Sequence, residues 1–119
     1  MLTDAQIREF KDRGILIARN ILHQNSVQKA KEGANKLVTE LADRLVANGL
    51  LKHAHADEPL ETRLLRISQS GCESEIPLLY RSQLHLPEFF PLFSDEQLLS
   101  CVRQLLPGAR NLRIYPNYR

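Results

Sequence analysis

The chain has 119 residues, of which 43% are hydrophobic and 25% charged, and it carries a net charge of +2. This length corresponds to at most one small domain. The basic residues are scattered, so composition gives no support for binding to nucleic acid or to an anionic membrane surface.

The lack of recognisable targeting signals and the cysteine usage both favour a cytoplasmic protein. The charged N-terminus argues against a signal peptide, and no apolar run approaches the ~20 residues that span a bilayer. Cys72 and Cys101 lack any paired spacing, which is typical of free thiols in a reducing compartment. We expect Cys101, which lies among apolar residues, to be a small core residue.

The first predicted element is a short helix over residues 4–13. Thr3 and Gln6 have the spacing of a capping box, in which each side chain bonds the backbone of the other residue. Gly14 suits the left-handed position that ends a helix. The compact apolar run that follows this glycine predicts a buried strand over residues 15–19.

A second and longer helix is expected to begin at Asn25 or Ser26, either of which can act as the N-cap, and to end before Gly49. Its apolar residues recur at intervals of three and four and form one stripe: Val27, Ala30, Ala34, Val38, Leu41 and Leu45. Residues 50–62 lose this periodicity and contain a proline, which indicates a loop.

The stretch from residue 63 to residue 84 has the weakest pattern in the chain. It favours a strand over residues 64–68, a turn at Ser70 and Gly71, and a short helix over residues 76–84.

The C-terminal third is more clearly patterned. Pro87 suits the first turn of a short helix, and Ser94 with Gln97 forms a second capping box. The helix that follows should bury one apolar face and end at residues 107–108; that face consists of Leu98, Leu99, Val102, Leu105 and Leu106. Apolar and polar residues then alternate over residues 112–117, which predicts a terminal strand.

One constellation in the predicted loop has metal-ligand spacing. His55 and Asp57 are spaced like two ligands of a 2-His-1-carboxylate iron site with His85 as the third, and His53 with His55 could alternatively form a zinc pair. Both sites would need rigid support from a second shell. Because the loop is unpatterned, we interpret these residues as ordinary solvated side chains and predict no metal site.

Two stretches of the chain resemble the phytanoyl-CoA dioxygenase family of iron(II)- and 2-oxoglutarate-dependent oxygenases. The first is the opening "LTDAQIREFKDRGILIARNIL", in which the family's L-T-x-x-Q-x-x-x-F-x-x-x-G pattern falls on Leu2, Thr3, Gln6, Phe10 and Gly14. The second is "LLSCVRQLLPGARNLRIYPNYR", which looks like the family's helix and the strand that enters its "PNY" stretch.

This resemblance implies an α+β fold, in which N-terminal helices pack against one sheet of a double-stranded β-helix. The family's iron ligands, an H-x-D followed much later by a His, come after the strand that "PNYR" resembles. Residues 1–119 are therefore expected to form a single partial domain: the N-terminal helices and first strands, without catalytic or metal residues and catalytically silent alone. The resemblance places Tyr115, Asn117 and Arg119 near the pocket, as candidates for contact with cosubstrate or substrate.

Two functional hypotheses follow. In the first, the whole enzyme uses Fe(II) and 2-oxoglutarate to hydroxylate an aliphatic small-molecule substrate. In the second, the chain is a small α+β protein–protein interaction module without catalytic activity, which pairs its open strand edges with a partner protein.

Overall fold

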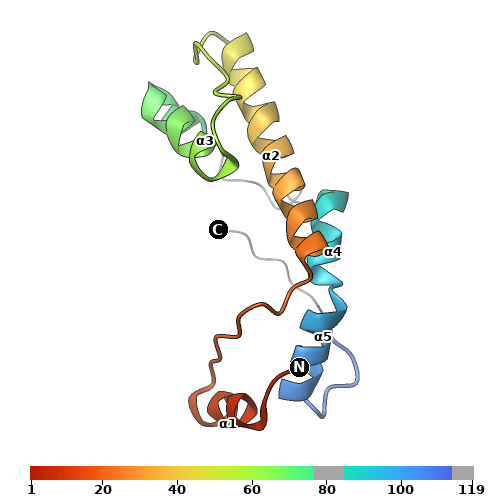
Figure 1. Cartoon of the computed structure of the whole chain (residues 1–119). Helices are drawn as coiled ribbons and strands as arrows, with labels where there is room; N and C mark the ends of the chain where they lie inside the picture. Colours follow the sequence, from red (N-terminus) through yellow and green to blue (C-terminus); the bar gives the residue numbers. More distant parts are fainter. Residues whose placement is uncertain (77–84, 114–119) are drawn as a thin grey trace.

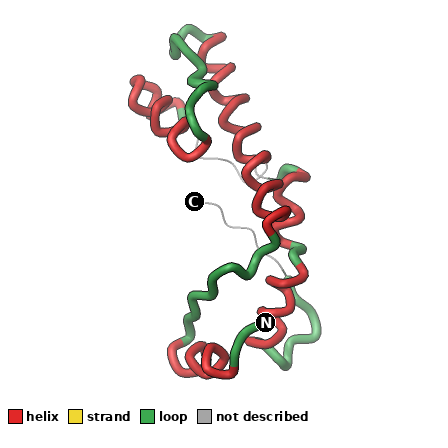
Figure 2. The backbone as a smooth tube through the Cα atoms, viewed as in Figure 1, coloured by secondary structure: helices red, strands yellow, loops and turns green. Residues whose placement is uncertain are grey.

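The computed structural model describes residues 1–76 and 85–113, and within these ranges every regular element is a helix (Figures 1 and 2). The elements follow in the order α1 Asp4–Arg13, α2 Gln24–Ala47, α3 Leu60–Ile67, η1 Ser68–Cys72, η2 Glu73–Glu75, η4 Pro87–Phe89, α4 Phe90–Phe93 and α5 Glu96–Leu105. The predicted α+β fold, with first strands of a double-stranded β-helix, is therefore wrong for the described residues, which contain no strand.

The predicted strand over residues 15–19 is an irregular connection between α1 and α2. Ile15 is 58% exposed and Ile17 is 77% exposed, so the apolar run is not buried. A strand requires a neighbour that pairs with its backbone, and the described part of the chain supplies no such neighbour. The apolar run was therefore too weak a signal for a strand.

The predicted strand over residues 64–68 is also wrong, because most of it belongs to helix α3. Arg63 and Ile67 are one helical turn apart and both are buried on the inner face of α3. The predicted turn near Gly71 falls within η1, where Gly71 has a φ of 90°. Residues 77–84 of the predicted third helix lie outside the described residues, as do residues 114–117 of the predicted terminal strand.

The predictions that rest on local capping signals are confirmed at α1. Thr3 and Gln6 form the complete capping box, and Gly14 ends the helix in the left-handed region with a φ of 71°. Helix α2 begins at Gln24, so the predicted N-cap at Asn25 or Ser26 is wrong, and it ends at Ala47, before Gly49, as predicted. Pro87 opens the short helical turn η4 as expected.

The main core lies between α2 and α3 and includes the thiol of Cys72, which donates a hydrogen bond to the Leu50 carbonyl at 3.3 Å. The buried cluster consists of Leu41, Ala42, Leu45, Leu51, Ile67 and Cys72. Both cysteines are free, and Cys101 is buried in α5, as predicted. The leucine face predicted for α5 is less buried than expected, and Leu106 is exposed.

The molecule is elongated, with principal extents of 55 × 24 × 23 Å. Its radius of gyration is 18.3 Å, whereas a compact domain of this length has a radius of about 13.5 Å. It exposes 9110 Å², and a compact protein of this mass would expose about 6,600 Å². As Figure 1 shows, α2 and α3 form one end of the molecule and α1 and α5 form the other, with α4 between them against α2.

Helix α2 crosses η4 closely at Gly33. A Cβ atom at this position would lie 2.9 Å from the Glu88 Cβ and 3.3 Å from the Phe89 ring. Such a contact forces a backbone shift, because the Glu88 Cβ is fixed to its own main chain. Glycine is thus required here despite its low helix propensity.

We expect Gly33→Ala to lower the free energy of unfolding by about 1–2 kcal/mol, because overpacking outweighs the gain in helix propensity. Urea denaturation followed by circular dichroism would measure the change. Gln28→Ala at an exposed position of the same helix is the control and should be nearly neutral. A Gly33→Ala variant more stable than the parent would contradict the close approach of α2 and η4 at this position.

Candidate functional site

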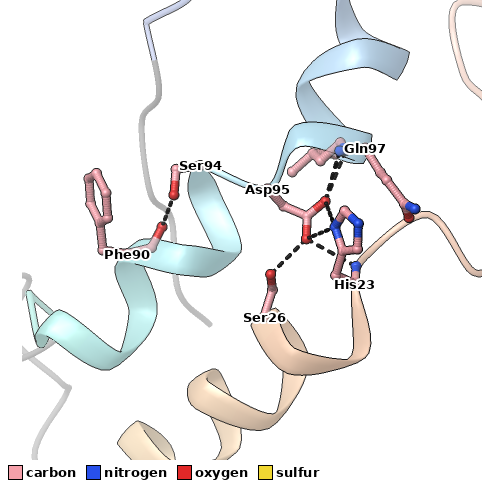
Figure 3. Close-up of polar contacts among 7 residues, drawn as sticks. His23, Ser26, Phe90, Ser94, Asp95 and Gln97 are labelled. Carbon is pink, nitrogen blue, oxygen red and sulfur yellow. Dashed lines mark hydrogen bonds and ion pairs between the residues drawn. The ribbon is translucent and has the colours of Figure 1, made fainter.

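The strongest polar cluster in the described residues centres on the carboxylate of Asp95, which directly precedes α5 (Figure 3). Asp95 is only 3% exposed. Its Oδ1 accepts hydrogen bonds from the backbone N–H groups of Gln97 at 3.0 Å and Leu98 at 3.2 Å. Asp95 is therefore the N-cap of α5 and satisfies two amides that have no partner inside the helix.

The same carboxylate also binds the start of α2. The backbone N–H of His23 donates to Oδ2 at 3.0 Å, and the Ser26 hydroxyl donates to Oδ2 at 2.7 Å. The imidazole Nδ1 of His23 lies 3.2 Å from Oδ1 and 3.1 Å from Oδ2. These contacts join residues about 70 positions apart in the sequence, so Asp95 connects the N-termini of two helices. We call the set His23, Ser26 and Asp95 the junction.

The junction stabilises the ionised form of Asp95. The hydrogen bond from Ser26 makes the largest contribution and lowers the pKa of Asp95 well below its ordinary value of 3.8, against the opposing effect of burial. Hydrogen bonds from the His23 and Leu98 amides and from the His23 ring lower the pKa further. The positive ends of two helix dipoles act in the same direction.

The junction contains Ser, His and Asp, but not in the order of a catalytic triad. In a triad the histidine lies between the serine and the aspartate and takes the proton of the hydroxyl. Here the Ser26 hydroxyl donates directly to Asp95, so the aspartate lies between the other two residues. The base beside the Ser26 hydroxyl is thus the Asp95 carboxylate, and its lowered pKa makes it too weak to turn Ser26 into a nucleophile. The junction is suited to holding helices together.

Two open pockets lie beside the junction, with volumes of about 360 and 340 Å³. Glu96 lines both of them; the first also includes Met1 and Ser100, and the second includes His23. The second pocket does bring together a histidine, serine hydroxyls and carboxylates, but these include the junction, whose hydrogen bonds do not place the histidine as the base for a hydroxyl, as an active site for group transfer would need.

Comparisons with family models, with curated proteins and with solved structures found no match to this chain. No helix within residues 1–76 and 85–113 combines the length and apolar character needed to cross a membrane.

The histidines singled out in the sequence are not brought together. His53, Asp57 and His85 are exposed, and the nearest polar partner of the His55 Nε2 is the Ser70 hydroxyl at 3.3 Å. The described residues contain no group of three or more His, Cys, Asp or Glu side chains that could hold a metal ion. The candidate cosubstrate residues Tyr115, Asn117 and Arg119 lie outside the described residues.

Sequence reasoning missed the junction because it assigned the cap of α5 to the wrong residue. The predicted capping box of Ser94 and Gln97 is wrong: the Ser94 hydroxyl donates to the Phe90 carbonyl at 3.0 Å, and Asp95 is the cap. Aspartate is as good an N-cap as serine, so the sequence contained a competing signal. No local signal, however, indicated that His23 and Ser26 would share this carboxylate.

Proposed function

We propose that residues 1–119 form the helical N-terminal part of an iron(II)- and 2-oxoglutarate-dependent oxygenase similar to phytanoyl-CoA dioxygenases. The observation that supports this most is the opening motif. Thr3, Gln6 and Gly14, which carry the sequence resemblance, are also the residues that start and stop α1. The shared pattern therefore corresponds to a definite structural unit, a helix with fixed ends.

The described residues do not fit an iron centre, since none of them form a suitable group of ligands. The resemblance itself assigns the iron ligands to a part of the enzyme beyond these residues, and the chemical steps belong to that part. The proposed role of this chain is to support the catalytic domain and to shape the entrance for an aliphatic substrate. Tyr115, Asn117 or Arg119 would contribute the contact with cosubstrate or substrate.

The proposal is tested with the complete open reading frame that contains this chain. We expect an in-frame H-x-D and a later His after the codon for Arg119, and we expect the purified product to decarboxylate 2-oxoglutarate only when Fe(II) is present. Residues 1–119 alone are the control and should show no turnover. A reading frame without those ligands, or a full-length product that does not consume 2-oxoglutarate, would overturn the proposal.

A second candidate function is a helical protein–protein interaction module without catalytic activity. It is favoured by the exposed apolar residues Ile15 and Ile17, which lie close together on the connection between α1 and α2, and by the large surface of the elongated chain. Apolar side chains exposed together on a surface often mark an interaction site. A reading frame that stops at Arg119 and yields a stable, folded monomer would favour this candidate over the oxygenase.

The exposure of Ile17 leads to a prediction of its own. We expect Ile17→Ser to change the free energy of unfolding by less than about 0.5 kcal/mol relative to the parent, because the side chain packs against few other atoms. The same variant should reduce the fluorescence of an apolar dye that binds to exposed apolar surface. Leu16→Ser is the matched control: Leu16 is half-buried, and this change should cost about 1 kcal/mol. A larger loss of unfolding free energy for Ile17→Ser than for Leu16→Ser would show that the Ile17 side chain is buried.

A further inference from the structure

Residues 14–22, here called the connecting segment, link α1 to α2 (Figure 1). Within the described residues, no hydrogen bond and no ion pair involves residues 15–22. The segment therefore has little polar support of its own, and its course depends on how the helices at its two ends are held.

The first end is held through α1, which packs against α5. Leu2 is buried, and its backbone N–H donates to the Gln104 Oε1 at 3.0 Å. The Sδ atom of Met1 accepts hydrogen bonds from the Ser100 hydroxyl at 3.7 Å and from the Gln104 Nε2 at 3.4 Å. The start of the chain is thus attached to the C-terminal half of α5.

The second end is held at the opposite end of the same helix. His23, the residue after the connecting segment, bonds Asp95 through its backbone and its ring, and Ser26 adds a third contact. Helix α5, α1, the connecting segment and the start of α2 therefore form a closed ring, as Figure 1 shows. Figure 3 shows the bonds from Asp95 to His23 and Ser26 that close this ring.

We propose that the junction is a latch: its contacts with α2 fix the position of the α1–α5 pair, and their loss releases that pair and the connecting segment. Helix α4 packs on α2 and is separated from α5 only by Ser94 and Asp95. This short link provides a hinge when the latch is open. The inference concerns conformation and is independent of the oxygenase proposal.

The variant Asp95→Ser distinguishes loss of the contacts with α2 from loss of the N-cap of α5. Serine caps a helix about as well as aspartate, so α5 should remain intact, but the shorter side chain cannot also reach His23 and Ser26. Ser94→Ala is the matched control, because Ser94 bonds only within α4.

The readout is the distance between spin labels in α1 and α2, measured by pulsed electron resonance. Lys11→Cys and Gln28→Cys provide two exposed attachment sites, while the native thiols of Cys72 and Cys101 are only 2% and 5% exposed. We expect one narrow distance peak in the parent and in Ser94→Ala. In Asp95→Ser the narrow peak should be lost, with the helical circular dichroism signal unchanged.

A narrow peak retained in Asp95→Ser would overturn the latch. If Asp95→Ser lost helical signal, the double variant His23→Pro with Ser26→Ala would decide instead, because it removes the ring, the backbone N–H of residue 23 and the serine hydroxyl but leaves Asp95 and its two α5 amide bonds in place. Proline fits the His23 φ of −62° at the start of α2. The proposal requires that this double variant also lose the narrow peak, and a peak identical to that of the parent would refute it.

Discussion

Asp95→Ala is expected to lower the melting temperature of the chain by about 10 °C, since several buried hydrogen bonds are lost together. The variant leaves the Gln97 and Leu98 amides without their cap and removes the acceptor for His23 and Ser26. Thermal unfolding followed by circular dichroism would measure the change. Ser94→Ala removes one neighbouring bond within α4 and should shift the midpoint far less; equal shifts for the two variants would contradict the central role of Asp95.

The contribution of Asp95 should also depend on pH. Its pKa in the folded chain lies below the ordinary value of 3.8, so the folded state binds the carboxylate proton less readily than the unfolded state. The resulting stabilisation is fully present above the unfolded pKa and is lost as the pH falls below it. We expect the stability difference between the parent and Asp95→Ser to shrink as the pH is lowered from 7 to 3. A difference that stays constant over this range would contradict the lowered pKa.

Arg63→Ala is the second substitution for which we expect a large effect. The guanidinium of Arg63, which is 4% exposed, donates through Nε and Nη2 to the Ala54 carbonyl at 3.1 and 3.0 Å. Its Nη1 donates to the Thr39 hydroxyl at 2.7 Å. Arg63 thus joins α3, the loop before it and α2. Removing it leaves these acceptors unpaired, and we expect a loss of about 3 kcal/mol in urea denaturation.

Two further variants show whether the geometry of Arg63 matters. Arg63→Lys keeps the charge but loses the planar fork that bonds one carbonyl twice, so we expect it to recover only part of the loss. Arg66→Ala is the matched control on the same helix. Arg66 is exposed, and its ion pair with Glu58 at 3.5 Å should contribute less than about 1 kcal/mol. Similar losses for Arg63→Ala and Arg66→Ala would mean that Arg63 does not anchor the loop.

Arg63 also explains why α3 was not predicted from the sequence. Its inner face includes Arg63 and Ile67, and a charged residue in that position hides the helical repeat from an interpretation based on apolar residues. The guanidinium can be buried there only because Ala54 and Thr39 supply acceptors. Those partners come from other parts of the chain, and no local pattern indicates them.

The ends of α1 were predictable because short-range groups determine them: Thr3 and Gln6 are three residues apart, and Gly14 directly follows the helix. The junction depends instead on contacts between residues about 70 positions apart, and the sequence contains no local sign of that pairing. The run after Gly14 was misread as a strand because an apolar run alone does not supply the neighbour that a strand needs. In the described part of the chain, the predictions are therefore wrong mainly where contacts between residues far apart in the sequence determine the structure.

The long sequence separation within the junction has a consequence for how the chain is synthesised. Helix α2 and its core with α3 can begin to form once residues 24–76 have left the ribosome, since those contacts lie within that segment. The hydrogen bonds from the start of α2 to Asp95, and from Leu2 to Gln104, can form only after α5 has been synthesised. Closing such long loops carries an entropic cost that local helix formation avoids. We therefore expect α1 and α5 to be the last of the described helices to reach their final positions during translation.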